Sequence, residues 1–467
     1  MHSYLSMHLK KCILAGLVLF ATIPNANSQP LNLYDAVNKT LANYPLILQR
    51  ESEVASSRAH ITTINGNRLP ALRLIGEATA GTSNSLPGSY FPLGVIPSTS
   101  GSIRATNNGS LSSGTIAISY LDWQFYTFGY YNAQQKEAKA QLAASKAGLE
   151  SDKYLLSQSV ITLYLDWLKK YQLMKVEMQN VERTRTILNA IKATVNSGLK
   201  PGVDSATASA EYARARIAYL QALGDYKYDQ AYLHSYTGTD TTGMAPDTSI
   251  FTGAFLDKIK LFEPADSVAG THPLLDLYEK QYEQQAATGN VIAHRYLPRV
   301  AFEGAGWQRG SSISSTDMYA PDALNATANT RYNYLLGLSL SYNLFDIKHR
   351  HDELKENSYR TDAAAHALQN QQLELNRLLQ QAGIGYNTTM LKLQELPVRL
   401  HSATQAYGQQ VALYRAGLNT LTDVTTALYV LNQSETDLVL AQDDMLQLLY
   451  LRAGLSGQLD TFLQNFK

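Results

Sequence analysis

The densest group of side chains that could do chemistry is His349-Arg350-His351-Asp352-Glu353. Imidazoles and carboxylates bind Zn²⁺ when they converge on one point. His349 and His351 are two residues apart, however, and residues at positions i and i+2 of a helix do not share a face. The spacing therefore favours a solvated or interfacial helix face, and we expect no metal centre.

Other catalytic patterns are missing from the sequence. We find no nucleophile elbow, phosphate-binding loop or zinc-protease helix signature. Glu303 and Arg309 fall in a segment expected to be a strand, where polar residues facing a water-filled lumen explain them without catalysis. We predict that the protein is not an enzyme and holds no cofactor.

The N-terminal segment has the layout of a signal peptide at residues 1–28. Lys10 and Lys11 precede a short apolar run at 12–23, and Ala26-Asn27-Ser28 supplies a cleavage site. The alternative is a buried N-terminal helix. Cleavage would remove the single cysteine, Cys12, and leave 37 basic against 39 acidic residues. Such a balance gives no reason to expect nucleic acid as a partner.

The composition suits a protein that meets a bilayer interface without membrane-spanning helices. Charged residues make up only 17% of the chain, and it contains 30 tyrosines, whose rings carry a polar tip. After the first 28 residues no apolar run is long enough to cross a membrane as a helix.

The sequence also contains an internal repeat, because four landmarks recur in the same order at offsets of 219 to 228 residues. In the first half the landmarks are Pro45, Pro70, Gly198 and Gly238, and in the second half they are Pro273, Pro298, Gly417 and Gly457. Each copy is expected to form a helix, two strands, a very long helix, a turn and a helix.

These landmarks predict the domain boundaries. The first repeat covers 29–238, with a polar loop at 82–112, and the second covers 271–457, with strands at 299–310 and 330–345 around a loop at 311–329. Residues 239–270 form an inter-repeat, equatorial insert, and 458–467 form a C-terminal tail.

Alternating side chains indicate strands, and long stretches without proline indicate helices. Ile116, Ile118 and Tyr120 share one face of a strand of about 10 residues, a length that crosses a bilayer when tilted. Residues 130–197 and 347–416 are expected to be long helices, the second kinked at Pro397. A coiled-coil seam is predicted at Val160, Tyr164, Trp167, Tyr171, Met174, Met178 and Val181.

An aromatic cluster follows the second strand of the first repeat. Its composition is that of the aromatic girdle of a membrane barrel, although an aromatic core is an open alternative. The members of this cluster are Trp123, Phe125, Tyr126, Phe128, Tyr130 and Tyr131.

Four amphipathic strands cannot close a barrel, and unpaired strand edges are not tolerated in hydrocarbon. Since even small membrane barrels use about eight strands, the chain is expected to assemble with further copies. A structural or adhesive surface protein and a soluble coiled-coil scaffold remain as alternatives.

With its duplicated layout and its Gly198-Leu199 and Gly417-Leu418 turns, the chain resembles the TolC family of outer-membrane efflux proteins. The resemblance implies an α+β membrane protein, with a long α-helical coiled-coil barrel and a transmembrane β-barrel shared between protomers, four strands from each. It implies a homotrimer in the outer membrane that extends into the periplasm. Its partners would be outer-membrane lipid, a periplasmic membrane-fusion adaptor and an inner-membrane RND or ABC pump. The function implied is the passive exit duct of a tripartite efflux pump or a type I secretion system.

The resemblance also implies roles at the helix turns. Gly198, Leu199, Gly417 and Leu418 correspond to the tip turns that dock with the adaptor. Asp204, Tyr414 and Asp423 match residues of the closed periplasmic gate, whereas Asn419 and Thr426 depart from the charged lock of the family. Two interpretations of the aspartates are open: they ring a narrow opening and favour cations, or they stabilise the first turn of a helix.

Overall fold

The structure is a computed structural model that describes residues 30–85, 103, 105–198, 201–238, 244–251, 255–262, 267–270, 272–314, 318 and 331–467. The signal peptide predicted at 1–28 and Leu199 lie outside these residues, as do most positions of the two polar loops. The described part divides into two units. One comprises the described residues within Met1–Arg50, Leu149–Asp276 and Asn370–Lys467, and the other comprises those within Glu51–Gly148 and Leu277–Gln369.

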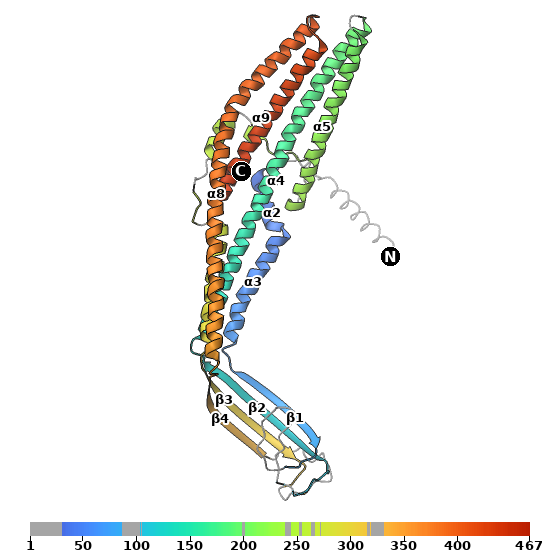
Figure 1. Ribbon diagram of the computed structural model, residues 1–467. Helices are drawn as coiled ribbons and strands as arrows, with labels where there is room; N and C mark the ends of the chain where they lie inside the picture. Colours follow the sequence, from blue (N-terminus) through green and yellow to red (C-terminus); the bar gives the residue numbers. More distant parts are fainter. Residues whose placement is uncertain are drawn as a thin grey trace, which may run out of the picture. The chain divides into compact units, whose positions relative to one another are not determined.

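The second unit contains one antiparallel sheet in the order β1-β2-β3-β4 (Figure 1). Its strands are β1 (Ala71–Gly81), β2 (Ser112–Tyr126), β3 (Arg299–Ser311) and β4 (Arg331–Ser341). The middle pair, β2 and β3, joins the two halves of the sequence, with Asp122 opposite Glu303. Beyond β4, Asn343 accepts a hydrogen bond from the backbone N–H of Phe345 and forms the turn into the next helix.

Neither face of this sheet is covered by a second layer of the described residues. Every position of β1 is exposed, and in β4 only Ser339 is partly covered. Leu74 on β1 is 79% exposed and Leu338 on β4 is 72% exposed. A folded chain rarely leaves so large an apolar surface bare unless a membrane or another protein covers it.

Helices make up the rest of the structure. They are α2 (Leu33–Asn43), α3 (Pro45–Gly66), α4 (Tyr130–Asn196), α5 (Gly202–Thr237), α6 (Phe255–Ile259), α7 (Pro273–Arg295), α8 (Asp346–Arg415), α9 (Leu421–Ser456) and α10 (Leu459–Gln464), with short 3₁₀ turns at Ser249–Phe251 and Lys260–Phe262. Helix α8 continues through Pro397. No helix within the described ranges combines the length and apolar character needed to cross a membrane.

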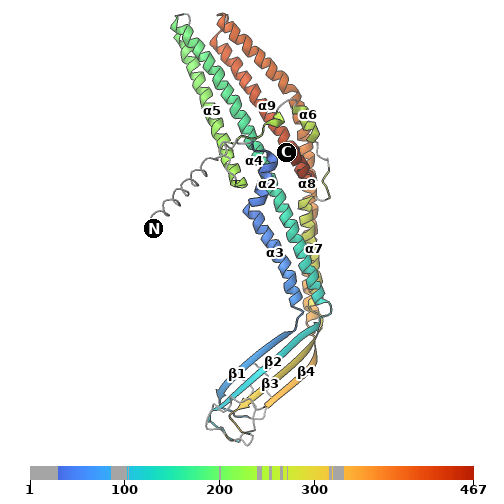
Figure 2. The same cartoon turned by 180° about the vertical axis from the view of Figure 1, so that it is seen from behind.

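In the first unit, α4 with α5 and α8 with α9 form two helical hairpins whose turns lie at the same end (Figures 1 and 2). Both turns depend on glycine. Gly198 and Gly417 have φ angles of 71° and 76°, a left-handed conformation that ends a helix and that residues with a Cβ atom rarely adopt. The glycines that end α5 and α9, Gly238 and Gly457, also have positive φ angles.

The core of the first unit lies among α2, α4, α9 and α10. Val160, Tyr164 and Trp167 of the expected seam are buried there, whereas Met178, farther along α4, is 49% exposed in the single chain. The buried part of the seam explains the packing of α4 against the core. Its exposed part is available to another chain.

Charged side chains join the two hairpins at intervals. Arg183 of α4 donates two hydrogen bonds, of 2.8 and 2.5 Å, to the carboxylate of Glu435 on α9. Lys169 of α4 donates to Asp443 of α9 at 3.1 Å, and this carboxylate is only 6% exposed. Burial raises the pKa of Asp443 to about 6, although Lys169 opposes the shift.

Candidate functional site

A hydrogen bond connects the turns of the two hairpins. The hydroxyl of Tyr414, near the end of α8, donates to Oδ2 of Asp204 on α5 at 3.0 Å. Burial first, and then the neighbouring carboxylate, raise the pKa of Tyr414 to about 12. Since the phenol stays protonated at neutral pH, it remains a donor to Asp204.

The aspartate of the second repeat is held differently. Asp423 forms a capping box with Thr420, because its Oδ2 accepts from the Thr420 N–H at 2.9 Å and its own N–H donates to the Thr420 hydroxyl. The Thr420 hydroxyl, which donates to Oδ2 of Asp423 at 2.6 Å, and then the Thr420 N–H lower the pKa of Asp423. In contrast, α5 begins after Pro201 without any side-chain cap. Asp204 and Asp423 occupy matching positions in the two repeats, but their side chains form different hydrogen bonds.

Asn419, which the resemblance predicts to depart from the charged lock of the family, lies within its own turn. Its amide Nδ2 donates to the backbone carbonyl of Gln410 at 3.1 Å and also to the Gln410 side chain. This side chain therefore holds the α8–α9 turn.

The α8–α9 turn ends in an exposed apolar side chain. The Leu418 N–H donates to the Leu413 carbonyl, so the backbone closes on itself, and Leu418 is 74% exposed. Behind the turns, a small cluster of side chains joins all four helices. Its buried members are Leu188, Ile191, Ala208 and Leu421, with Tyr414 packed against them. Leu199, the matching residue of the first repeat, lies outside the described residues.

The strand register places every charged side chain of the sheet on one face. Directly opposite residues in antiparallel strands point to the same side, and successive residues alternate. Register pairs such as Arg73 with Tyr120 and Asp122 with Glu303 then define a charged face. Its charged residues are Arg73, Glu77, Asp122, Arg299, Glu303, Arg309 and Arg331.

The opposite, apolar face carries no charged residue among the described strands. Its large side chains are Leu72, Leu74, Leu121, Phe302, Leu336, Leu338 and Leu340. Tyr332 and Tyr334 continue this face toward the loops, and each is 81% exposed. A sheet with these faces can separate hydrocarbon from water.

The six aromatic residues lie where β2 joins α4. Trp123 pairs with Phe302 and Tyr126 with Val300, so both belong to the apolar face. Phe128, whose φ angle of 48° is strained for a residue other than glycine, lies in the turn between strand and helix. Tyr130 and Tyr131 begin α4. The six residues are only partly buried or exposed, so they do not form a closed aromatic core.

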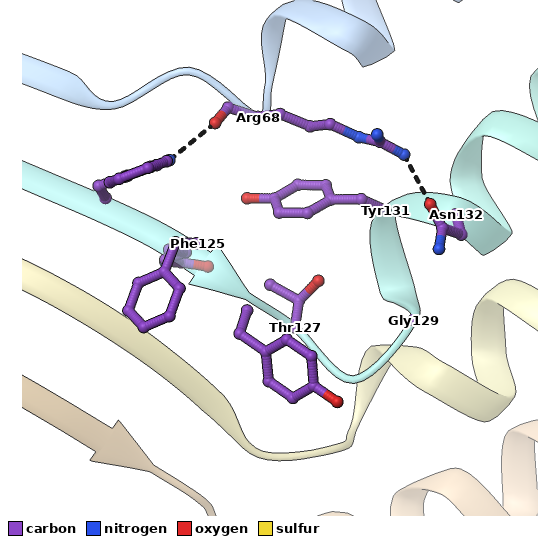
Figure 3. A pocket seen from close by; sticks show the side chains of 9 residues that line it. Arg68, Phe125, Thr127, Gly129, Tyr131 and Asn132 are labelled. Carbon is purple, nitrogen blue, oxygen red and sulfur yellow. Dashed lines mark hydrogen bonds between the residues drawn. The ribbon is translucent and has the colours of Figure 1, made fainter.

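A cleft of about 320 Å³ opens beside these aromatic residues (Figure 3). Arg68 and Tyr131 both line the cleft, and the Arg68 guanidinium donates to Oδ1 of Asn132 at 2.8 Å (Figure 3). The indole N–H of Trp123 donates to the Arg68 carbonyl at 3.0 Å. These bonds hold the end of α3 against the junction of β2 and α4.

The histidine-rich motif of α8 does not converge on a metal-binding geometry. Within the described residues no group of three histidine, cysteine, aspartate or glutamate side chains could hold a metal ion. The carboxylates of the motif have cationic partners: Lys348 donates to Asp352, and Arg295 donates to Glu353.

The sequence alone does not predict the division of the sheet into a charged and an apolar face. The signal was available in part, since alternation within one strand can be read directly. The pairing of β2 with β3 joins residues almost 200 positions apart, however, and the sequence does not reveal it.

Solved outer-membrane channels share this fold. The outer membrane protein VceC of Vibrio cholerae aligns with a TM-score of 0.71 and 15% identity, over 91% of this chain and 96% of that chain. The CmeC channel of Campylobacter jejuni aligns with a TM-score of 0.70 and 13% identity, over 94% and 90%. The MtrE channel of Neisseria gonorrhoeae, in its open state, aligns with a TM-score of 0.67 and 14% identity, over 92% and 89%.

Comparison of the sequence with known families shows to which family the chain belongs. No curated protein matches the chain in sequence. The family model for outer membrane efflux proteins matches residues 36–239 and 273–450, which together make up well over half of the chain. The chain therefore belongs to the outer membrane efflux protein family.

Proposed function

We propose that three copies of this chain join their sheets into one closed wall of 12 strands in the outer membrane, four from each copy. This wall and the helices would form a passive exit duct for solutes that a periplasmic adaptor and an inner-membrane RND or ABC pump deliver. The duct would serve a tripartite efflux pump or a type I secretion system.

The observation that carries this proposal is that the four-stranded sheet has two open edges. β1 and β4 each pair with one strand of the chain and offer their other edge outward. Backbone N–H and C=O groups at such an edge have no water to bond in hydrocarbon, so a membrane sheet must close. Because β1 and β4 run antiparallel, β4 of one copy can pair with β1 of the next and continue the sheet.

The faces of the sheet support the same conclusion. With the apolar face outward, lipid would contact leucines and aromatic rings. The seven charged residues would then face a water-filled lumen, whereas a charged side chain on the lipid face costs about 2–4 kcal/mol near the middle of the bilayer.

The helix turns fit the periplasmic end of such a duct. Exposed Leu418 and the left-handed Gly198 and Gly417 would form the docking surface for the adaptor, together with Leu199. Asp204, Tyr414, Asp423 and Asn419 would form the constriction, with the Tyr414–Asp204 bond as its cross-hairpin contact.

The domain scheme from the sequence remains part of the proposal: cleavage after residue 28, repeats at 29–238 and 271–457, an equatorial insert at 239–270 and a tail at 458–467. The described residues of the insert pack on the core of the first unit through Ile250, Phe255 and Ile259.

Assembly and conduction test the proposal together. The protein, extracted from outer membranes in detergent, should be trimeric by native mass spectrometry and should conduct ions in planar bilayers. Leu74→Pro in β1 and Leu338→Pro in β4 place proline in the edge strands, where it removes a backbone donor, and should reduce the trimer yield. Leu418→Ser, far from these edges in sequence, should leave the trimer intact. A stable, non-conducting monomer would refute the proposal.

A further inference from the structure

Two arginines lie directly opposite each other on the charged face of the sheet. Arg309 of β3 pairs with Arg331 of β4, near the ends of the strands that lead to the loops. On its other side, Arg309 is opposite Ile116 of β2. Like charges directly opposite each other on neighbouring strands repel, so the two arginines do not stabilise each other.

Two carboxylates form a similar pair at the other end of the same face. Asp122 of β2 is opposite Glu303 of β3, and the outer neighbours in this row are Ala71 and Gly337. The Ser339 hydroxyl donates to Glu303 at 2.7 Å. Arg309 lies six positions beyond Glu303 on β3, which corresponds to about 20 Å along the strand.

Each end of the face therefore carries a pair of like charges, carboxylates at one end and guanidiniums at the other, while Arg73 and Arg299 lie nearer the carboxylate pair. If the four strands merely needed charges to balance, Arg309 and Arg331 would be better placed opposite Asp122 and Glu303. Glu77 is the only carboxylate in the row of the two arginines, and Ile116 lies between it and Arg309. Each chain thus contributes two guanidiniums and one carboxylate to this row.

We propose that Arg309 and Arg331 form an anion-binding band inside the lumen at its loop end, where solutes leave the duct. This inference rests on the proposed closed wall, which turns the charged face inward. Three copies would bring six guanidiniums and three carboxylates to the band. It would concentrate solutes that carry several phosphate, sulfate or carboxylate groups.

The chemistry of the guanidinium group suits this role. Arginine stays protonated at any physiological pH and binds oxyanions through two parallel N–H donors. The Cβ atoms of two arginines directly opposite each other on adjacent strands lie about 5 Å apart, so one polyanion can contact both guanidiniums. At physiological ionic strength the field of surface charges decays over about 8 Å, so the band acts on solutes that pass close to the wall.

Sided block of single channels in planar bilayers tests the band. Inositol hexakisphosphate serves as the polyanion and is added to one chamber at a time. Every channel carries Leu418→Cys, and a bulky thiol reagent that reacts from one chamber identifies the side of the helix turns. This marker is usable because the only cysteine, Cys12, lies in the predicted signal peptide.

The polyanion should block from the loop side, and R309Q/R331Q should weaken that block about tenfold. R309K/R331K keeps both charges and should retain most of the block. Q308A/Y332F changes the neighbouring residues on the apolar face and should block as the parent channel does.

The outcomes separate the two proposals. Channels that conduct but are blocked equally with and without the two arginines, or only from the helix side, would overturn the anion-binding band and leave the exit duct standing. A protein that forms no channels at all would refute the duct itself. If R309Q/R331Q does not assemble, two other measurements of polyanion block decide. The first compares block of R309K/R331K with block of the parent channel. The second follows block of the parent channel over a series of salt concentrations, since block by a charged band must weaken as ionic strength rises.

Discussion

The hydroxyl of Tyr414 offers the sharpest test of the proposed constriction at the helix turns. Tyr414→Phe deletes the donor to Asp204 and keeps the ring that packs against the cluster behind the turns. The bond joins the two hairpins of one chain, so its loss should favour their separation. We therefore expect a more conductive channel with an intact fold.

The magnitude follows from the partly buried position of the pair. A hydrogen bond to a charged group contributes about 1.5–3 kcal/mol, and partial exposure reduces this to about 1 kcal/mol here. If three copies open together, the closed state loses about 3 kcal/mol in all, or about 100-fold in the ratio of open to closed channels.

Single-channel recording measures this ratio directly. Tyr212→Phe is the matched control, because Tyr212 packs in the same cluster but its ring faces Arg216. Asp204→Asn should act like Tyr414→Phe, only more weakly, because an amide still accepts a hydrogen bond. Asp423→Asn should change helix stability more than conductance, since the Asp423 carboxylate is bonded to Thr420.

Two results would refute this reasoning. Equal open probabilities for Tyr414→Phe and Tyr212→Phe would mean that the bond does not restrain the turns. A large increase in conductance from Asp423→Asn, without one from Asp204→Asn, would reverse the order that the two bonding patterns predict.

Three further predictions concern stability and can be measured by thermal unfolding in detergent. Because burial raises the pKa of Asp443 to about 6 against about 4 when unfolded, its protonation stabilises the fold fully below pH 4. This contribution is lost as the pH rises through 6, so the melting temperature of the wild type relative to Asp443→Asn should fall between pH 4 and 7. Gly417→Ala should destabilise by about 1 kcal/mol because of its positive φ, whereas Gly408→Ala, in the exposed interior of α8, should stabilise slightly. Arg183→Ala should cost about 1–2 kcal/mol by leaving Glu435 half-buried without its partner, and adding Glu435→Ala should restore part of the loss.

Local patterns in the sequence determined much of the architecture. The repeat of four landmarks is confirmed by the family match, which falls in two segments, 36–239 and 273–450. The resemblance to outer-membrane efflux proteins and the mixed class of long helices and strands are confirmed as well. Membership of this family also agrees with the expectation of a channel in the outer membrane and not an enzyme. The helices and strands could be predicted because they depend on residues that are close together in the sequence. Proline and glycine mark the ends of helices, and alternation of apolar and polar residues marks a strand.

Roles at the turns stay predictions, and the sequence described their chemistry only in part. The cap formed by Thr420 and Asp423 involves residues three positions apart, so it could have been read from the sequence. The bond from Tyr414 to Asp204 crosses 210 positions and depends on how two hairpins pack.

Tertiary structure alone decided how the charges are arranged. Each strand shows which of its residues alternate, but only pairing shows that Asp122 meets Glu303 and that Arg309 meets Arg331. The physical reason is that a one-residue shift in register turns every side chain of a strand to the other face, and no local preference of the chain resists that shift. Register, set by contacts across the whole sheet, is what separates a charged face from an apolar one.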